Sequence, residues 1–256
     1  MPINDFGLKK FHITLFFIHF IQAFAILLLA NNFTVPIVTN IFYLETRSSG
    51  IFTNTSYFTN ISLVIMVWLY LMVTAFFHLL LINAKIYKWY EQNLIKNISY
   101  IRWIEYGISS SIIIVVVSIL VGFLDATGLF LLFFVNLVMI FFGFLMERNN
   151  HSLKSGEKLD WLPFVAGSIC GVIPWMIILI YYIASIYNNS SYLYSINFIV
   201  PVMIFLWILF PLNMFLHYKK VGVFKDYINT EKTYILLGLI TKTLLAWQIL
   251  FTFLSN

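Results

Sequence analysis

Two ionisable residues lie deep inside long apolar stretches of the chain: a lysine, Lys242, and a glutamate, Glu105. A charged lysine near the middle of a membrane helix costs about 2.5–3.5 kcal/mol on insertion scales, so such a residue usually has a function. An acid and a base at one depth are expected to pair, because either charge alone is costly in a low dielectric. The pair is either a structural contact between two helices or a reactive amine beside its counterion. A lysine amine condenses with an aldehyde to a Schiff base, and a nearby carboxylate keeps that imine protonated.

Two histidines, His19 and His78, are predicted to lie at the level of this pair. Counting residues from the nearest helix ends places all four side chains ~9–14 Å below the same membrane surface. A single histidine at this depth is also compatible with a core residue that hydrogen-bonds to backbone or water. Two at one level favour a polar or water-filled pocket. Zinc is poorly supported, because no helical i,i+4 ligand pair and no cysteine ligand accompanies them.

The remaining ionisable residues near the apolar stretches fall close to predicted helix ends. We interpret three histidines as ordinary surface residues: His12, His151 and His217. We interpret three charged residues as interfacial: Asp125, Glu147 and Arg148. Aromatic residues fit either core packing or the wall of a ligand cavity: Trp175, Trp207, Phe210 and Trp247. The sequence has no glycine-rich phosphate loop and no hydrolase motif, so we do not expect an enzyme.

The composition predicts an all-α membrane protein that forms a single seven-helix domain over residues 1–256. Of these residues, 61% are hydrophobic and only 10% are charged, which leaves too little polar surface for a soluble domain. Backbone that faces lipid must satisfy its own hydrogen bonds, so each apolar run is read as a helix. The predicted spans are 11–30, 61–84, 98–123, 126–146, 161–186, 195–218 and 233–254.

The connection over residues 31–60 is the only long one, and it is rich in β-branched and aromatic residues. Arg47-Ser48-Ser49-Gly50 divides it into two runs, which predicts a β-hairpin.

The basic residues predict the orientation. With seven spans, 13 of the 15 lysines and arginines fall on the side of the N-terminus, and the loops there are too short for a nucleic-acid-binding surface. The positive-inside rule then places the N-terminus in the cytoplasm and the C-terminus outside. The 13 are Lys9, Lys10, Lys85, Lys88, Lys96, Arg102, Arg148, Lys154, Lys158, Lys219, Lys220, Lys225 and Lys232. The one cysteine, Cys170, cannot form an internal disulfide.

Several motifs together resemble those of the heliorhodopsins, retinal-binding seven-helix membrane proteins, and they run through nearly the whole chain. In the third and last predicted helices they are Arg102-Trp103-x-Glu105-Tyr106-x-x-Ser109-Ser110-Ser111 and Lys242-x-x-x-Ala246-Trp247-Gln248. Elsewhere they are His19-x-x-Gln22, Phe77-His78, Val135-Asn136, Pro163-Phe164 and Gly171-Val172-x-Pro174-Trp175. The predicted orientation also agrees with that family.

The resemblance implies that Lys242 carries all-trans retinal as a protonated Schiff base and that Glu105 is its counterion. His19 and His78 would line a polar cavity on the cytoplasmic side and influence where a released proton goes. The other implied cofactor-binding residues are Tyr106, Ser110, Asn136, Met139, Ile140, Trp207, Phe210 and Gly238. Gly238 replaces a serine that is common in the family, and Val165 stands where some members have a pocket tryptophan.

The resemblance further implies a light sensor in the cell membrane that does not pump ions. A single intramembrane carboxylate is consistent with this, because a pump usually needs separate proton acceptors and donors. The expected partners are membrane lipids, a second copy in a homodimer that involves the β-hairpin, and a cytoplasmic signalling partner. A light-gated proton conductor built on the same retinal site is the alternative. A transporter or receptor-like scaffold, with Lys242 and Glu105 as a structural pair, is a third interpretation.

Overall fold

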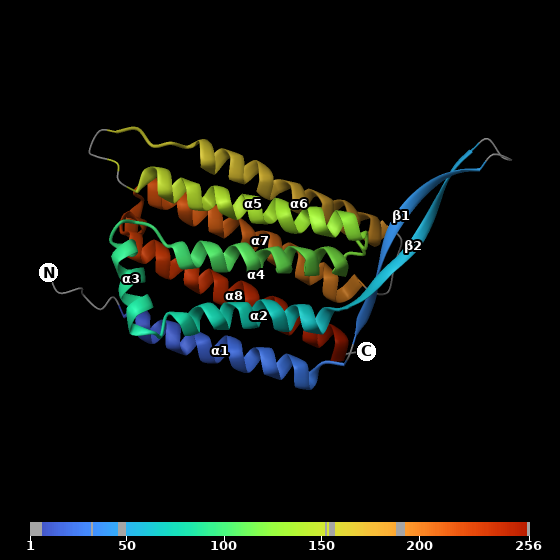
Figure 1. The fold of residues 1–256 in the computed structure, drawn as a ribbon, viewed down its shortest axis with the longest axis horizontal. Coiled ribbons are helices and arrows are strands. Elements are labelled where there is room, and N and C mark those ends of the chain that lie inside the picture. The colour runs from blue at the N-terminus through green and yellow to red at the C-terminus, as the bar shows by residue number, and fades with distance from the viewer. Residues whose placement is uncertain are drawn as a thin grey trace.

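The computed structural model of the chain describes residues 7–31, 33–45, 50–151, 153, 157–187 and 193–254. Within these residues, seven helices are long and apolar enough to cross a membrane, and they pack side by side in one bundle (Figure 1). They are α1 (Leu8–Leu29), α2 (Leu63–Leu80), α4 (Tyr100–Leu120), α5 (Ala126–Asn150), α6 (Leu162–Tyr187), α7 (Leu193–Tyr218) and α8 (Tyr227–Leu254). The prediction of an all-α integral membrane protein with seven spans is confirmed.

The predicted hairpin is also confirmed. Strands β1 (Thr34–Glu45) and β2 (Gly50–Ser62) pair antiparallel and project from one end of the bundle (Figure 1). The base of the hairpin is fixed to the bundle, because the Val38 N–H donates to the Leu124 carbonyl at 3.0 Å. Of the predicted interruption, Arg47, Ser48 and Ser49 lie outside the described residues.

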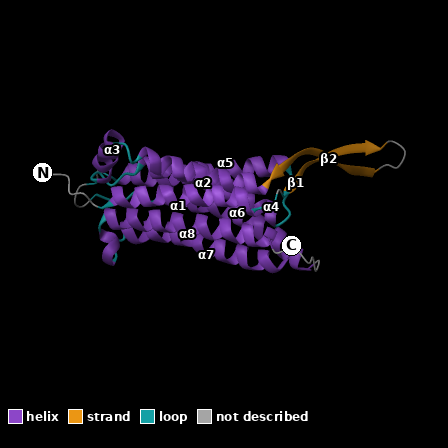
Figure 2. Cartoon of the chain, turned by 90° about the horizontal axis from the view of Figure 1, so that it is seen from below, coloured by secondary structure: helices purple, strands orange, loops and turns teal. Residues whose placement is uncertain are grey.

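A short helix at the opposite end, α3 (Ala84–Leu94), was not predicted (Figures 1 and 2). The expected second span, 61–84, ends at Leu80 instead, and α3 then crosses the end of the bundle. Asn83 caps its first turn, because its side chain accepts hydrogen bonds from the Lys85 and Ile86 amides at 3.0 and 3.4 Å. The helix is amphipathic and buries one side against the bundle.

The last helix starts earlier than predicted. Asp226 accepts a hydrogen bond from the Ile228 amide at 3.0 Å, and α8 begins at Tyr227 rather than at 233. A short 3₁₀ turn, η1 (Gly222–Lys225), precedes it. The first turns of α8 therefore belong to the bundle and bring Glu231 into its interior, where 1% of the residue is exposed. Asp125 similarly caps α5, since its carboxylate accepts from the Gly128 amide at 2.7 Å.

The interior differs between the two ends of the bundle. Toward the hairpin, α4 contributes a buried aliphatic stretch, and α2, α7 and α8 pack around it to form the largest apolar core. Toward α3, the interior also holds histidines, carboxylates and an arginine. Lys242 lies near the boundary between these two regions.

Candidate functional site

Lys242 of α8 and Glu105 of α4 meet inside the bundle. The Lys242 Nζ lies 2.5 Å from Glu105 Oε1, and the two residues are 4% and 6% exposed. Thr74 of α2, which the sequence analysis did not select, donates its hydroxyl to the same oxygen at 2.6 Å. Buried charges need both a partner and further hydrogen bonds, and this arrangement supplies them. The predicted acid and base are therefore in contact.

A mostly apolar cavity of about 200 Å³ opens on one side of Lys242, between α4, α5, α6, α7 and α8. Every residue that the family resemblance assigned to the pocket, other than the two histidines and Glu105, lines it: Tyr106, Ser110, Asn136, Met139, Ile140, Trp207, Phe210, Gly238 and Lys242. Asn136 joins α5 to α4 by donating to Ser110 and Ser111 at 2.8 and 3.1 Å. The cavity is thus an apolar slot with a few fixed polar groups and an amine at its edge.

The mostly apolar lining of this cavity fits a long apolar ligand that is attached through Lys242, and the wall also holds two unpaired hydroxyls. The Ser109 and Thr241 hydroxyls are buried along its wall and have no partner among the described residues. Gly171 lies behind two side chains of the wall, Met139 and Trp207, and leaves room for them. A Cβ there would approach Met139 Sδ to 2.6 Å and the Trp207 ring to 2.9 Å. A larger residue at 171 would push both side chains into the slot.

Gly238 allows close approach of Tyr106. The Tyr106 hydroxyl donates to the Tyr234 carbonyl at 2.5 Å, and a Cβ on residue 238 would lie 2.9 Å from that hydroxyl oxygen. The serine that is common in the family at this position would therefore displace Tyr106. Val165, the other departure, is 51% exposed and does not line the cavity.

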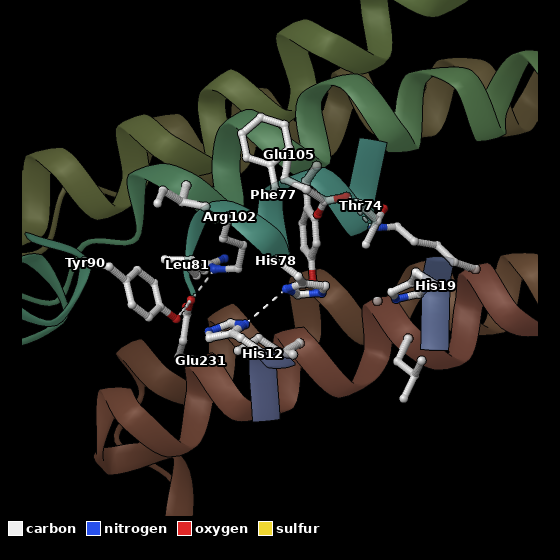
Figure 3. A pocket seen from close by; sticks show the side chains of 16 residues that line it. His12, His19, Thr74, Phe77, His78, Leu81, Tyr90, Arg102, Glu105 and Glu231 are labelled. Carbon is white, nitrogen blue, oxygen red and sulfur yellow. Dashed lines mark hydrogen bonds and ion pairs between the residues drawn. The ribbon is translucent and has the colours of Figure 1, made fainter. Parts of the chain in front are cut away.

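A second, more polar cavity lies on the other side of the Lys242–Glu105 pair (Figure 3). His19 and His78, both predicted for such a cavity, line it, and their rings stack with centroids 5.8 Å apart. The cavity extends from Lys242 past the histidines to Tyr90 and Glu231. The ion pair therefore separates an apolar cavity from a polar one.

The interpretation of His12 as a surface residue is wrong. It is 2% exposed, and its Nδ1 lies 3.1 Å from His78 Nδ1 (Figure 3). Two imidazole nitrogens at this distance form a hydrogen bond only when one carries a proton and the other does not. The reason for the error is that α1 begins at Leu8 and α3 covers this end of the bundle, so His12 lies inside it. Its ring also contacts the Tyr90 ring, with centroids 5.5 Å apart.

The interpretation of Glu147 as interfacial is also wrong, because 2% of the residue is exposed. Arg102 is buried and pairs with Glu147 of α5 and, at 2.7 Å, with Glu231 of α8. Its guanidinium also lies 4.0 Å from the centre of the Tyr234 ring. We call Arg102, Glu147 and Glu231 the charge cluster. One cation is shared by two carboxylates, so the cluster has an excess negative charge if both acids are ionised.

Neutral donors complete the charge cluster. Ser99 donates its hydroxyl to Glu231 at 2.7 Å, and Tyr90 of α3 donates to the same oxygen at 2.9 Å. Burial and the neighbouring Glu231 carboxylate raise the pKa of Tyr90 well above its ordinary value, so its hydroxyl keeps the proton that it donates.

Trp103 connects the charge cluster to the apolar cavity. Its indole N–H donates to Glu147 at 2.6 Å, and the same residue lines the cavity beside Lys242. The ring fits against Gly143, where a Cβ would lie 2.5 Å from a ring carbon. No larger residue fits at 143 without moving the indole.

His217 is likewise buried, contrary to the surface interpretation, with 4% exposed. Its Nδ1 lies 2.9 Å from the Phe224 carbonyl, and this contact holds η1 against the end of α7. His151 and Arg148 fit their predicted positions at the edge of the bundle. Among the described residues, no three histidine, cysteine or acidic side chains are arranged to hold a metal ion.

The comparisons with known proteins agree with this architecture. The family model for heliorhodopsin matches residues 8–254. A solved structure, described as a light-driven proton pump LR (Mac) from Leptosphaeria maculans, has a TM-score of 0.59 and 13% sequence identity. That match covers 99% of this chain and 98% of the other. At this identity it establishes a shared rhodopsin-like fold. No curated protein matches the sequence.

Proposed function

This chain belongs to the heliorhodopsin family of retinal-binding, light-responsive membrane proteins, and from that premise we propose that it is a light sensor that does not pump ions. The observation that carries the proposal is the contact between Lys242 and Glu105 at the junction of two cavities. Family membership favours this proposal over the scaffold interpretation, in which the ion pair has only a structural role.

Retinal, in its all-trans form, would occupy the apolar cavity and be held through Lys242. The mostly apolar lining of the cavity, and the room that Gly171 leaves for Met139 and Trp207 in its wall, support this placement. When bound there, retinal supplies absorption of visible light and photoisomerisation. Trp207 and Met139 confine the slot from the sides, and Asn136 fixes the distance between α4 and α5.

Glu105 would stabilise the positive charge on the Lys242 nitrogen, and Thr74 would hold the carboxylate in place. A change of direction of the Lys242 N–H weakens this contact, because a hydrogen bond loses strength steeply away from linearity. His19, His78 and His12 then offer acceptors on the side of α3 for a proton that leaves the pair. This rearrangement is the slow signal in our proposal.

A single intramembrane carboxylate was the sequence-based reason to expect no pumping, and the structure does not support that count. The structure buries Glu147 and Glu231 as well, but both lie on the same side of Lys242 as the histidines. Pumping needs acceptor and donor groups on opposite sides of the photoactive group. The aliphatic core toward the hairpin offers no buried acid or histidine among the described residues, which supports a sensor over a pump.

A light-gated proton conductor is the alternative, and it is favoured by a polar cavity whose lining runs from Lys242 past the histidines to Tyr90 and Glu231. We expect illumination under voltage clamp to produce no sustained current in membranes that contain the protein. A light-driven current whose reversal potential follows the proton gradient would establish conduction instead and overturn the sensor proposal. Lys242→Ala is the control, since a current that survives this change does not arise from the proposed site.

The orientation, with the N-terminus in the cytoplasm, belongs to the same proposal, as does the homodimer that uses the hairpin. The cytoplasmic signalling partner stays a prediction. Cysteine labelling from either side of the membrane, on variants with a single cysteine in the hairpin or in the connection between α7 and α8, would test the orientation.

A further inference from the structure

The outward side of α3 is basic and aromatic, and neither cavity uses it. The exposed residues of α3 and the turn after it recur every three or four positions, so they lie along one side of the helix. We call them the α3 outer face: Lys85, Lys88, Trp89, Gln92, Ile95 and Lys96. The one acid of α3, Glu91, is buried. The face therefore presents three positive charges and no negative charge of its own.

This face adjoins the lipid-facing surface of the bundle. Trp89 is 45% exposed, and its ring contacts that of Tyr100, with centroids 5.6 Å apart. Tyr100 contacts Phe144 of α5 at 5.5 Å, and Phe144 contacts Phe141, which is 54% exposed in the middle of a membrane-spanning helix. An unbroken row of aromatic rings thus leads from α3 onto a surface that meets lipid tails. Trp89 lies at the end of that row, beyond the end of the membrane-spanning helix α2.

The helix is also held rigidly. Tyr87, Tyr90 and Leu94 are buried on its inner side, and the Tyr90 hydroxyl binds Glu231 of the charge cluster at 2.9 Å. The capping bonds of Asn83 fix its start. The α3 outer face is therefore a preformed surface whose position relative to the membrane is set by the bundle.

We propose that the α3 outer face binds the headgroups of anionic lipids in the adjacent leaflet. The ammonium groups of Lys85, Lys88 and Lys96 attract phosphate and carboxylate oxygens, and each basic residue near an anionic surface contributes on the order of a fivefold preference. Tryptophan is favoured at the headgroup level, and an exposed aliphatic residue such as Ile95 enters the acyl boundary. An acidic soluble partner would use the lysines, but it would not explain why the aromatic row continues onto the lipid-facing surface.

The test uses the full chain reconstituted in phosphatidylcholine vesicles that contain a minority of brominated lipid. Bromine on the acyl chains quenches nearby tryptophans, and the Trp89 signal is the difference between the wild type and Trp89→Phe. We expect brominated phosphatidylserine to quench this signal several times more strongly than brominated phosphatidylcholine. The triple change Lys85→Gln, Lys88→Gln and Lys96→Gln should make the two lipids equivalent.

The matched control is the triple change Lys219→Gln, Lys220→Gln and Lys225→Gln, which removes as many charges from another loop on the same side. It should keep the preference. Equal quenching of the wild type by both lipids, or a preference that survives the α3 triple change, would overturn the proposal. Absence of quenching by either lipid would also overturn it, because Trp89 would then not lie near the acyl chains. If the α3 triple variant does not fold, Lys88→Gln alone should lower the preference measurably, by up to about fivefold.

Discussion

The two ends of the bundle bury different kinds of side chain. Toward the hairpin, the described interior of α4 from 112 to 119 is aliphatic apart from Ser118, which donates to the Ile114 carbonyl at 2.8 Å. Toward α3, the interior contains all the buried lysine, arginine, glutamate and histidine residues that the structure describes, up to the level of Lys242. On one side of Lys242 the interior is a packed aliphatic core, and on the other side it contains side chains that can gain or lose a proton.

This asymmetry assigns different tasks to the two halves. The apolar half stabilises the bundle by close packing and, among the described residues, offers no buried acid, histidine, lysine or arginine to a migrating proton. The polar half contains the acceptors and connects them, through Glu231 and Tyr90, to α3. A signal that starts at Lys242 is therefore expected to leave the membrane on the side of α3.

The largest expected effect is the loss of colour in Lys242→Ala. Without the amine, retinal has no covalent attachment, so the visible absorption band should disappear after regeneration. Lys232→Ala, which changes an exposed lysine of the same helix, should keep the band. A spectrum recorded on purified protein decides the matter, and a visible band in Lys242→Ala would place the reactive group elsewhere.

Arg102→Met should be the most destabilising change in the polar half. It removes the one cation between Glu147 and Glu231, and breaking a buried pair in this way typically costs about 3–5 kcal/mol. Arg148→Met changes an exposed arginine nearby and should stay within about 0.5 kcal/mol of the wild type. Denaturant unfolding in detergent measures both. Equal stability of the two variants would contradict the described charge cluster.

Glu105→Gln should shift the absorption maximum to the red. A carboxylate beside the cation stabilises the ground state, and its neutral replacement narrows the excitation gap. Glu157→Gln, at an exposed acid, provides the control and should leave the maximum unchanged. An unshifted spectrum in Glu105→Gln would mean that Glu105 is not the counterion, whatever its distance from Lys242.

The smallest predicted effect concerns His12. His12→Phe removes the hydrogen-bond partner of His78, which is worth about 1 kcal/mol, or roughly a fivefold change in rate. We expect a correspondingly shorter lifetime of the light-induced state and an almost unchanged absorption maximum, as measured by flash photolysis. His151→Phe should change neither. If His12→Phe also behaves like the wild type, protons do not reach this part of the cavity.

The sequence predicted the seven spans, the hairpin and the central ion pair for clear physical reasons. Long apolar runs must form helices in lipid, and an ionisable residue in the middle of one is conspicuous. Depth along a helix can be counted from its ends, which is why Glu105 and Lys242 could be matched in level. Rotation about each helix axis cannot be counted in this way, so their contact needed the structure.

The charge cluster was missed because its members lie near the ends of apolar runs. There, a charge is ordinarily solvated or interfacial, and nothing local distinguishes Arg102 or Glu147 from such a residue. Their pairing depends on residues 45 and 129 positions apart along the chain. His12 was misjudged for a related reason, because the helix that covers it, α3, lies in a polar segment that carries no span signal.

The indole of Trp103 contacts two residues of α5, Glu147 and Gly143. Its N–H is bound by Glu147 on α5, and its ring rests in the notch left by Gly143 one turn earlier on the same helix. The ring therefore has little freedom to tilt independently of α5. A ligand that changes shape beside Trp103 therefore either leaves the indole in place or moves α5, with the Glu147 carboxylate, together with the indole.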